Sequence, residues 1–373
     1  MQRKAPPFRA DHVGSLLRPA AVQQAKAKHA RGDLSAQALK EIEDREIARL
    51  ISRQQEIGLS SVTDGELRRA MWHRDFLSFL TGISSIDSDK PYEWGGVKGA
   101  ALNLRIDSKL DFPANHPHLD HFRFVKSHTK PGGTAKMTIP SPSVIAPAKL
   151  FDMQNPEAPA YRDLDKLYDD LCAAYRKAVQ AFYDAGCRYL QIDEVRMVAV
   201  ADPNFRKTRG LSDDDFKNLV ALFDRLVSDS LRDRPKDMTI SMHNCRGNFR
   251  SRWAAEGSYE PVAERLFNIK GIDAYFLEYD SERAGGFEPL RYLPKPKLAV
   301  LGVVTSKTGA LEPKDGIKRR IDEATKYVDL DRLCISPQCG FASTEEGNEL
   351  AEEQQWAKLA FVKEIADEVW GNA

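Results

Sequence analysis

Two side chains that commonly bind metals, His243 and Cys245, lie two residues apart in the segment SMHNCRGN at 241–248. The residues just before this segment favour a β-strand that ends here. Residues i and i+2 of a strand point to the same face, so the imidazole and the thiol would point to one place. The pattern therefore indicates a candidate metal site at the end of a strand.

Other predicted strands also end in chemically active residues. These are Asp64 and Glu66 in TDGE, Asp193 and Glu194 in QIDE, Glu278 and Asp280 in LEYD, and Cys339 in SPQCG. Any one of them has an ordinary structural explanation, because an acid caps a helix and a cysteine fills a core. Their repetition at successive strand ends instead favours a functional site at one end of a barrel.

The set formed by His243, Cys245 and Cys339, with Glu278 as a harder fourth ligand, suits Zn²⁺. Structural zinc sites tend to use closely spaced cysteine pairs, whereas these ligands are distributed over three strands. We therefore expect the zinc to lie in the mouth of the barrel. The spacing of His243 and Cys245 is by itself a moderate signal, because the pattern H-x-C also occurs by chance.

The charge of this ligand set limits its chemistry. Two thiolates and a carboxylate give Zn²⁺ a net charge of about −1, which favours holding a further thiolate over generating hydroxide. A free thiol has a pKa near ~8.5, and binding to zinc deprotonates it. The set thus predicts alkylation of a thiol, with Glu278 as the exchangeable ligand. Glu66 and Asp193 lie close enough in this scheme to bind a cation such as an amino group.

The remaining sequence predicts the fold that positions these residues. Short apolar segments alternate with helices about eight times, which favours a single (β/α)₈ TIM barrel over residues 1–373. A doubly wound open sheet is the alternative, although no G-x-G-x-x-G turn supports a dinucleotide-binding version. Helices are expected at 35–57, 160–185, 212–231 and 344–369, and strands at 59–64, 135–139, 188–193, 238–243, 274–279, 298–304 and 332–336, with one more near 12–17.

A long insertion after an early strand is predicted at approximately 84–134, where glycine, proline and polar residues are frequent. We expect it to pack over one mouth of the barrel. His116, His118 and His121 cluster within it, and three histidines can form a metal site. No cysteine or ordered pair of carboxylates accompanies them, so a surface loop is the favoured interpretation.

The composition excludes several classes of partner. The 55 basic and 55 acidic residues balance, which gives no electrostatic reason to expect nucleic acid or an anionic membrane. No segment approaches the roughly 20 apolar residues of a membrane span, and the N-terminus lacks the apolar core of a secretory signal. Five cysteines form an odd and sparse set, which suits the reducing cytoplasm.

The segments HVGSLLRP, VTDGELRR, QIDE, MHNCRGN, YFLEYD and SPQCGFAS occur in this order. Together they resemble the cobalamin-independent methionine synthase family, especially its short, single-barrel homocysteine methyltransferases. The similarity covers nearly the whole chain. It implies a zinc-dependent S-methyltransferase on a (β/α)₈ barrel, with zinc held by His243, Cys245, Glu278 and Cys339. Homocysteine would contact Ser15, Glu66 and Asp193.

The chain departs from the family in ways that concern the methyl donor. Full-length members have two barrels, of which the first helps to bind a polyglutamylated folate, and only the catalytic half is matched here. The segment TIPSPSVIAPAKLF lacks the tryptophan that stacks on folate in the family. Lys307 lies near the position of the family's proton-donating histidine and is the candidate catalytic residue. Methyltetrahydrofolate, methylcobalamin and other methyl carriers all remain open as donors.

Two other functions fit the same residues. One is a zinc-dependent alkyltransferase for a different thiol, as in transfer of coenzyme M to an epoxide. The other is a barrel that binds zinc or a metabolite without catalysis. The acidic pair Glu66 and Asp193 favours the ammonium of homocysteine, whereas a sulfonate thiol would require arginine or lysine in these places.

Overall fold

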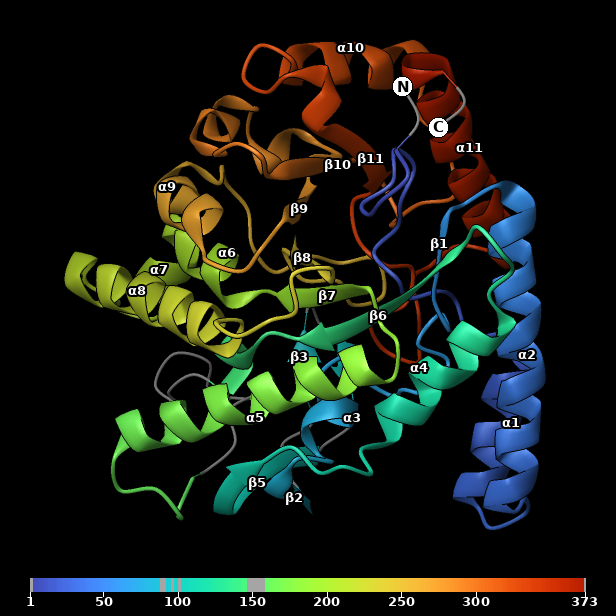
Figure 1. Cartoon of the computed structure of the whole chain (residues 1–373), viewed down its shortest axis with the longest axis vertical. Coiled ribbons are helices and arrows are strands. Elements are labelled where there is room, and N and C mark those ends of the chain that lie inside the picture. Colours follow the sequence, from blue (N-terminus) through green and yellow to red (C-terminus); the bar gives the residue numbers. More distant parts are fainter. Residues whose placement is uncertain (1–2, 88–91, 95–96, 100–101, 146–157, 372–373) are drawn as a thin grey trace.

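A curled sheet of seven parallel strands forms the centre of the molecule (Figure 1). The computed structural model describes residues 3–87, 92–94, 97–99, 102–145 and 158–371. All six neighbouring pairs in this sheet are parallel, so the carboxyl ends of the strands meet at one edge. The strands lie in the order β1 (Ser61–Val62), β6 (Thr134–Pro140), β7 (Tyr189–Glu194), β8 (Thr239–Asn244), β9 (Ala274–Glu278), β10 (Leu298–Val304) and β11 (Leu333–Pro337).

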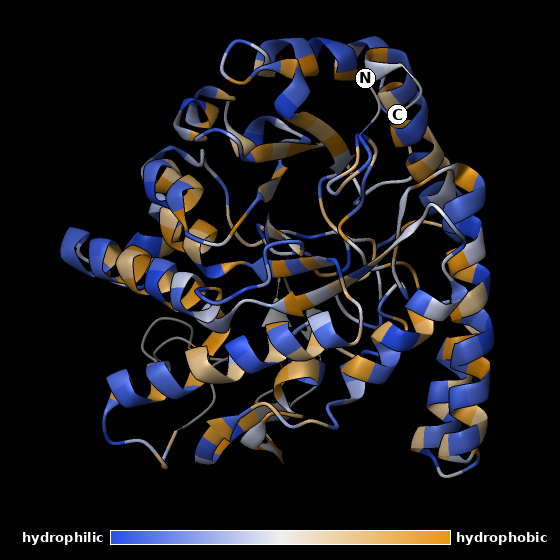
Figure 2. Ribbon diagram, viewed as in Figure 1, coloured by the Kyte–Doolittle hydropathy of each residue, from blue (hydrophilic) through white to orange (hydrophobic). Residues whose placement is uncertain are grey.

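Helices surround the sheet, and the two form a layered α/β fold (Figure 1). The strands are buried along almost their whole length, which explains their continuous apolar segments. Figure 2 shows these hydrophobic stretches at the centre and polar residues on the outer helices. The α-helices are α1 (Ala20–Ala30), α2 (Ala36–Ile57), α3 (Arg74–Leu77), α4 (Pro117–His128), α5 (Leu164–Asp184), α6 (Arg196–Ala201), α7 (Pro203–Thr208), α8 (Asp213–Ser230), α9 (Glu260–Asn268), α10 (Lys314–Ala324) and α11 (Glu352–Trp370).

Three of the four expected helices are confirmed as α2, α5 and α8. Ser35 caps α2, because its side chain accepts a hydrogen bond from the backbone of Ala38, and Ser212 forms a capping box at α8. The fourth prediction placed the start of a helix at Thr344, and this boundary is wrong. Residues 344–351 instead form a turn with left-handed Gly347 (φ 71°), and α11 begins at Glu352. None of the helices within the described ranges is long and apolar enough to cross a bilayer.

The N-terminal segment lies between the two ends of the seven-stranded sheet. Ala10 forms an isolated parallel bridge with Ile335 of β11, and the amide of Asp11 donates to the carbonyl of Ile335 at 3.0 Å. On its other side, the amide of Leu16 donates to the carbonyl of Gly65 at 2.9 Å, just after β1. The expected strand at 12–17 is not formed. A few separate hydrogen bonds instead connect this segment to β11 on one side and to the end of β1 on the other.

The region at 84–134 contains two kinds of structure. The antiparallel strands β2 (Thr81–Asp87) and β5 (Leu102–Asp111) pair with each other, as do the short strands β3 (Tyr92–Trp94) and β4 (Val97–Gly99). Helix α4 follows and packs against α2 and β6, so it belongs to the helical layer around the sheet. The single domain and its insertion stay predictions.

The three histidines of this region lie on or beside α4, and the expected surface loop is wrong. His116 and His118 are each 1% exposed. The ring of His116 stacks on Phe112 with centroids 4.8 Å apart, and the ring of His118 lies 5.5 Å from that of Phe76. Their clustering in the sequence reflects aromatic packing under α4.

Candidate active site

The four predicted metal ligands meet at the carboxyl edge of the sheet. His243 lies in β8, Cys245 follows β8, Glu278 is the last residue of β9, and Cys339 follows β11. The ligand atoms of all four lie within 4.8 Å of one another, and all four side chains are buried. Because β8 and β11 are not neighbours in the sheet, the curl of the sheet brings the two cysteines together.

The two cysteines form a close pair of free thiols. Their Sγ atoms lie 3.5 Å apart, and the backbone amide of Gly247 donates to Cys245 Sγ at 3.2 Å. Gly247 has a left-handed φ of 88°, which lets the chain turn back over the sulfur. The hydrogen bond from Cys245 holds the pKa of Cys339 well below its usual range, and the same pairing raises the pKa of Cys245. One thiolate is thus already favoured at this place.

His243 and Glu278 complete the set. Neither ring nitrogen of His243 forms a hydrogen bond of standard geometry with a described residue. Burial alone lowers the pKa of His243, but the nearby Cys339 thiolate outweighs burial and raises it. Glu278 is fully buried, and burial raises its pKa. Its Oε1 accepts a hydrogen bond from the amide of Arg246 at 2.7 Å, and its Oε2 lies 3.3 Å from Arg283 Nη2.

Glu66 lies at the same edge, beyond β1, and is held by neighbouring side chains. Its Oε1 accepts a hydrogen bond from Thr138 Oγ1 at 2.9 Å, and its Oε2 lies 3.4 Å from Arg69 Nη1. Its backbone is left-handed, with φ 58°, and its amide donates to Asp64 Oδ1 at 2.8 Å. Burial raises the pKa of Glu66, and Arg69 opposes this shift. The carboxylate is therefore already paired with one cation.

Asp193 differs from Glu66 in its electrostatic partners. It lies opposite His243 in the register of β7 and β8, and its Oδ1 accepts a hydrogen bond from Gln191 Nε2 at 2.7 Å. The structure shows no ion pair between Asp193 and any basic side chain of the described ranges. Burial raises the pKa of Asp193 to about 7.

Ser15 lies against the backbone beside Cys339. A Cβ atom at Gly340 would lie 1.9 Å from Ser15 Oγ, so only glycine permits this approach. The hydroxyl oxygen of Ser15 also accepts a long hydrogen bond, of 3.4 Å, from the amide of Ala342. The close packing fixes Ser15 at the edge of the metal-binding residues.

One cavity of about 240 Å³ contains most of the predicted site residues. Thiol, imidazole and carboxylate groups line it together with aromatic and basic ones. The predicted residues in its wall are Ser15, Glu66, Asp193, His243, Cys245 and Cys339; the others include Met71, Trp72, His73, Val195, Arg196, Phe205, Arg209, Arg246, Asn248 and Phe249.

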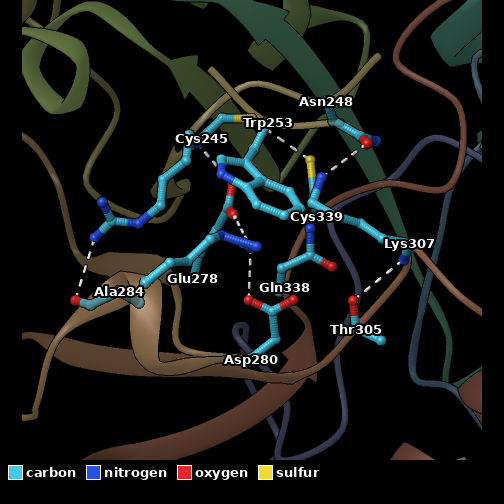
Figure 3. Close-up of polar contacts among 12 residues, drawn as sticks. Cys245, Asn248, Trp253, Glu278, Asp280, Ala284, Thr305, Lys307, Gln338 and Cys339 are labelled. Carbon is cyan, nitrogen blue, oxygen red and sulfur yellow. Dashed lines mark hydrogen bonds and ion pairs between the residues drawn. The ribbon is translucent and has the colours of Figure 1, made fainter. Parts of the chain in front are cut away.

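Lys307 lies beside this cavity, and it is not among the described residues that line it. Its Nζ donates to Asn248 Oδ1 at 3.0 Å (Figure 3). Asn248 in turn donates to the carbonyl of Gly340 at 2.9 Å. The hydrogen bond from Cys245 is the main cause of the lowered pKa of Cys339, and the positive charge of Lys307 adds to it. At Glu278 the same charge opposes the burial that raises the pKa. The catalytic role of Lys307 stays a prediction.

Trp72 and His73, which precede α3, are among the residues of the cavity wall that sequence reasoning missed. Their rings lie 4.6 Å apart. His73 is 2% exposed, neither of its ring nitrogens has a hydrogen-bond partner in the described part of the chain, and burial lowers its pKa well below the usual value. A tryptophan and a histidine shortly after VTDGELRR were the available signal, but no strand or helix pattern pointed them inward.

Comparisons with known proteins identify the family of the chain. Residues 154–361 match the family described as "Cobalamin-independent synthase, Catalytic domain". The uncharacterized protein YxjH of Bacillus subtilis is 47% identical over 99% of this chain and 96% of its own length.

Solved structures give the same result. A putative vitamin-B12 independent methionine synthase from Listeria monocytogenes is 38% identical, with a TM-score of 0.79 over 99% of this chain and all of the other. A B12-independent methionine synthase from Shewanella, solved in complex with selenomethionine, has a similar fold, with a TM-score of 0.70, 18% identity and 97% of each chain covered. The resemblance seen in the sequence motifs is confirmed, and the chain belongs to the cobalamin-independent methionine synthase family of methyltransferases.

Proposed function

We propose that this protein is a zinc-dependent methyltransferase that converts homocysteine to methionine. One observation carries the proposal: the ligand atoms of His243, Cys245, Glu278 and Cys339 lie within 4.8 Å of one another, beside a cavity that also contains two buried acids. A metal-binding set and a cation-binding set side by side match the two ends of homocysteine, which carries a thiol and an ammonium group.

The donor set fits zinc. Thiolate sulfur, imidazole nitrogen and carboxylate oxygen are its ordinary protein ligands. His243 lacks a standard hydrogen bond within the described structure, as expected for a ring whose nitrogen is a ligand. When bound, zinc supplies the acidity that keeps a substrate thiol deprotonated at neutral pH.

The acids give the site its preference for an amino thiol. Glu66 is paired with Arg69, whereas Asp193 has only the neutral amide of Gln191 as a hydrogen-bond donor among the described side chains. Asp193 is therefore the principal partner for the ammonium of homocysteine, and Glu66 supports it. Ser15, which lies next to the metal-binding set, would contact the amino-acid end of the same substrate.

The methyl donor would contact cavity residues that neither hold the metal nor bind the ammonium. Trp72 and Phe205 offer aromatic surface, and Arg209 offers positive charge. The substrate sulfur forms a bond to the methyl carbon while the bond from that carbon to the donor breaks, and the donor leaves with the electron pair. Methyltetrahydrofolate and other methyl carriers fit this scheme equally. Lys307 is the candidate for the proton that the departing donor takes up.

We also infer that the fold is a complete (β/α)₈ barrel in one domain. The support is the N-terminal segment, which bonds to β11 on one side and to the end of β1 on the other. An insertion at approximately 84–134 would include the paired strands β2 and β5. Five free cysteines favour a cytoplasmic location, since a reducing compartment keeps thiols available.

A product assay tests the proposal. The zinc-loaded protein is mixed with homocysteine and, in separate reactions, with methyltetrahydrofolate, its polyglutamate form and methylcobalamin, and methionine is measured. Methionine formation with at least one donor supports the proposal. Coenzyme M and 3-mercaptopropionate serve as comparison thiols. Faster alkylation of coenzyme M than of homocysteine would instead support the alternative thiol, and zinc binding without any thiol alkylation would indicate a binding protein.

A further inference from the structure

Arg283 makes an unusual contact with one of the proposed metal ligands. It lies in the 3₁₀ turn η3 (Glu282–Ala284), shortly after β9, and its Nη2 is 3.3 Å from Glu278 Oε2. The same Nη2 donates to Asp280 Oδ1 at 2.7 Å. The ring of Trp253 covers the guanidinium at 4.7 Å, and Figure 3 shows Glu278, Asp280 and Trp253 gathered around this place. Arg283 is thus fixed next to a carboxylate that the metal also needs.

The contact between Arg283 and Glu278 is incomplete. A strong ion pair between a guanidinium and a carboxylate has distances of about 2.7–2.9 Å and often uses two donors. Here the distance is 3.3 Å, and Arg283 Nε has no hydrogen-bond partner among the described residues. The arginine therefore holds Glu278 loosely and retains an unused donor in a buried place.

Glu278 would need such a partner if an incoming thiolate took its place on a bound metal. It is the hardest ligand of the set and the one that an incoming thiolate replaces most readily. Its side chain is fully buried, so the displaced carboxylate has no access to water. An unpaired buried carboxylate is strongly unfavourable, and exchange would stop unless another cation received it.

We propose that Arg283 is the positioning residue that receives the Glu278 carboxylate when a substrate thiol takes its place on the metal, an inference that rests on the proposed function. With a metal held by His243, Cys245 and Cys339, the entering thiol would replace the Glu278 carboxylate as the fourth ligand, and its proton would pass to solvent. The carboxylate stays ionised, and its contact with Arg283 shortens and gains a second hydrogen bond. Arg283 therefore favours the thiol-bound state.

The proposal predicts that loss of Arg283 weakens homocysteine binding without weakening zinc binding, which a purely structural arginine would not do. Arg283→Met removes the competitor for Glu278 Oε2, so zinc should bind as tightly as in the wild type or more tightly. Homocysteine should bind about 10- to 100-fold more weakly, the range expected for one lost charge-assisted hydrogen bond. A structural role would weaken metal and thiol binding together.

Two binding measurements on the full chain separate these outcomes without an assay of turnover. Zinc affinity is measured by competition with a chromogenic chelator. Homocysteine affinity is measured by the sulfur-to-metal absorption of the cobalt(II)-substituted protein. Arg291→Met provides the matched control, because Arg291 also stacks on an aromatic ring and pairs with an acid, Glu260, but lies at the surface. It should change neither affinity.

A double variant tests whether Arg283 acts through Glu278. In a Glu278→Gln background the displaced side chain is neutral, so Arg283→Met should weaken homocysteine binding by less than about threefold. The same loss in both backgrounds would overturn the proposal, as would a parallel loss of zinc and thiol affinity. Arg283→Lys, which keeps the charge but not the fork, should fall between wild type and Arg283→Met, and decides the matter if the methionine variant does not fold. Wild-type protein that binds no metal would instead remove the proposed function.

Discussion

The interior of the sheet contains two groups of buried polar residues that differ in how completely they are paired. Near the amino ends of the strands, Asp11, Lys136 and Tyr189 are fully buried. Lys136 Nζ lies 3.4 Å from Asp11 Oδ1, donates to the carbonyl of His12 at 2.5 Å, and lies over two aromatic rings. The carboxylate of Asp11 also accepts hydrogen bonds from Phe8 N, His12 N, Ser61 Oγ and Tyr189 Oη.

The polar side chains at the carboxyl edge are equally buried, but they have fewer hydrogen-bond partners. His243 and His73 form no standard hydrogen bond through their rings with any described residue, and Cys245 and Cys339 interact mainly with each other. Since unpaired buried polar groups destabilise a fold, such groups are retained where a ligand completes them. The amino-end group is complete in itself, and the carboxyl-edge group is complete only with a metal and substrates.

His118 limits this reasoning. Its ring nitrogens also lack hydrogen bonds within the described structure, yet it lies outside the cavity, packed against the rings of Phe76, His116 and His121. An unpaired histidine therefore indicates a ligand only where it lines a cavity together with other functional groups, as His243 and His73 do.

The largest expected effect concerns the metal. Wild-type protein should contain about one zinc per chain, and Cys245→Ser or Cys339→Ser should lose most of it and reduce turnover roughly 1,000-fold or more, because the ligands act as a unit. Elemental analysis and the methionine assay measure both. Cys172→Ser, which changes a buried cysteine on α5, is the matched control and should retain zinc. Full zinc retention in both ligand variants would contradict the proposed site.

The amino-end group should show the opposite behaviour. Lys136→Met leaves Asp11 buried without its cation and should lower the free energy of unfolding by about 3–5 kcal/mol, while zinc content stays unchanged. Urea titration and elemental analysis test the two parts. Lys363→Met, which breaks a more exposed pair with Asp367, should change stability by less than about 1 kcal/mol. Zinc loss in Lys136→Met at full folding would show that the two groups are not independent.

The third effect is an acid sensitivity of the histidines under α4. Burial lowers the pKa of His116 and His121 to about 4 and that of His118 well below its usual value. The positive charge of Arg69 further lowers the pKa of all three histidines, whereas the negative charge of Asp64 raises that of His121. Below about pH 6.5 the unfolded chain binds protons that the folded chain does not. The free energy of unfolding therefore decreases as the pH is lowered, by about 1.4 kcal/mol per pH unit for each histidine that stays neutral in the folded protein.

His118→Leu should remove one such contribution, so the free energy of unfolding should fall less steeply between about pH 6.5 and pH 4. The difference in slope should be about 1.4 kcal/mol per pH unit, measured by urea titration across this range. Wild-type protein measured across the same pH range provides the reference slope. An unchanged slope in His118→Leu would mean that this ring already carries a proton in the folded protein.

The sequence predicted the carboxyl-edge residues because they follow strands. Parallel strands bring their ends to one edge, so TDGE, QIDE and MHNC could be placed together without knowledge of the turns between them. Helix boundaries at Ser35 and Ser212 were equally local, since a side-chain oxygen pairs with an amide three residues on. The strand ends and helix starts could be predicted because each depends on residues that are close together in the sequence.

Residues outside regular elements could not be placed in this way. Trp72, His73 and Arg283 lie in or beside short turns whose course is set by packing with other parts of the chain. The helix expected at Thr344 failed for the same reason: Asn348 donates to the carbonyl of Ser306 at 2.8 Å, a contact between distant segments that holds residues 344–351 in a turn. Long-range contacts of this kind leave no periodic pattern in the sequence.

The smallest of the four effects tests whether Asp193 binds the ammonium group of the substrate. Its only described side-chain donor is the neutral amide of Gln191, so the ammonium of homocysteine would be its cation. Asp193→Asn keeps the shape and removes the charge, and one charge-assisted hydrogen bond is worth roughly 1.5–3 kcal/mol. The apparent KM for homocysteine should therefore rise about 10- to 100-fold while zinc content is unchanged. With 3-mercaptopropionate, which lacks the ammonium, the same variant should change the KM by less than about threefold. An equal penalty for both thiols would mean that Asp193 supports the cavity without contacting the amino group, and Glu66 would become the principal partner.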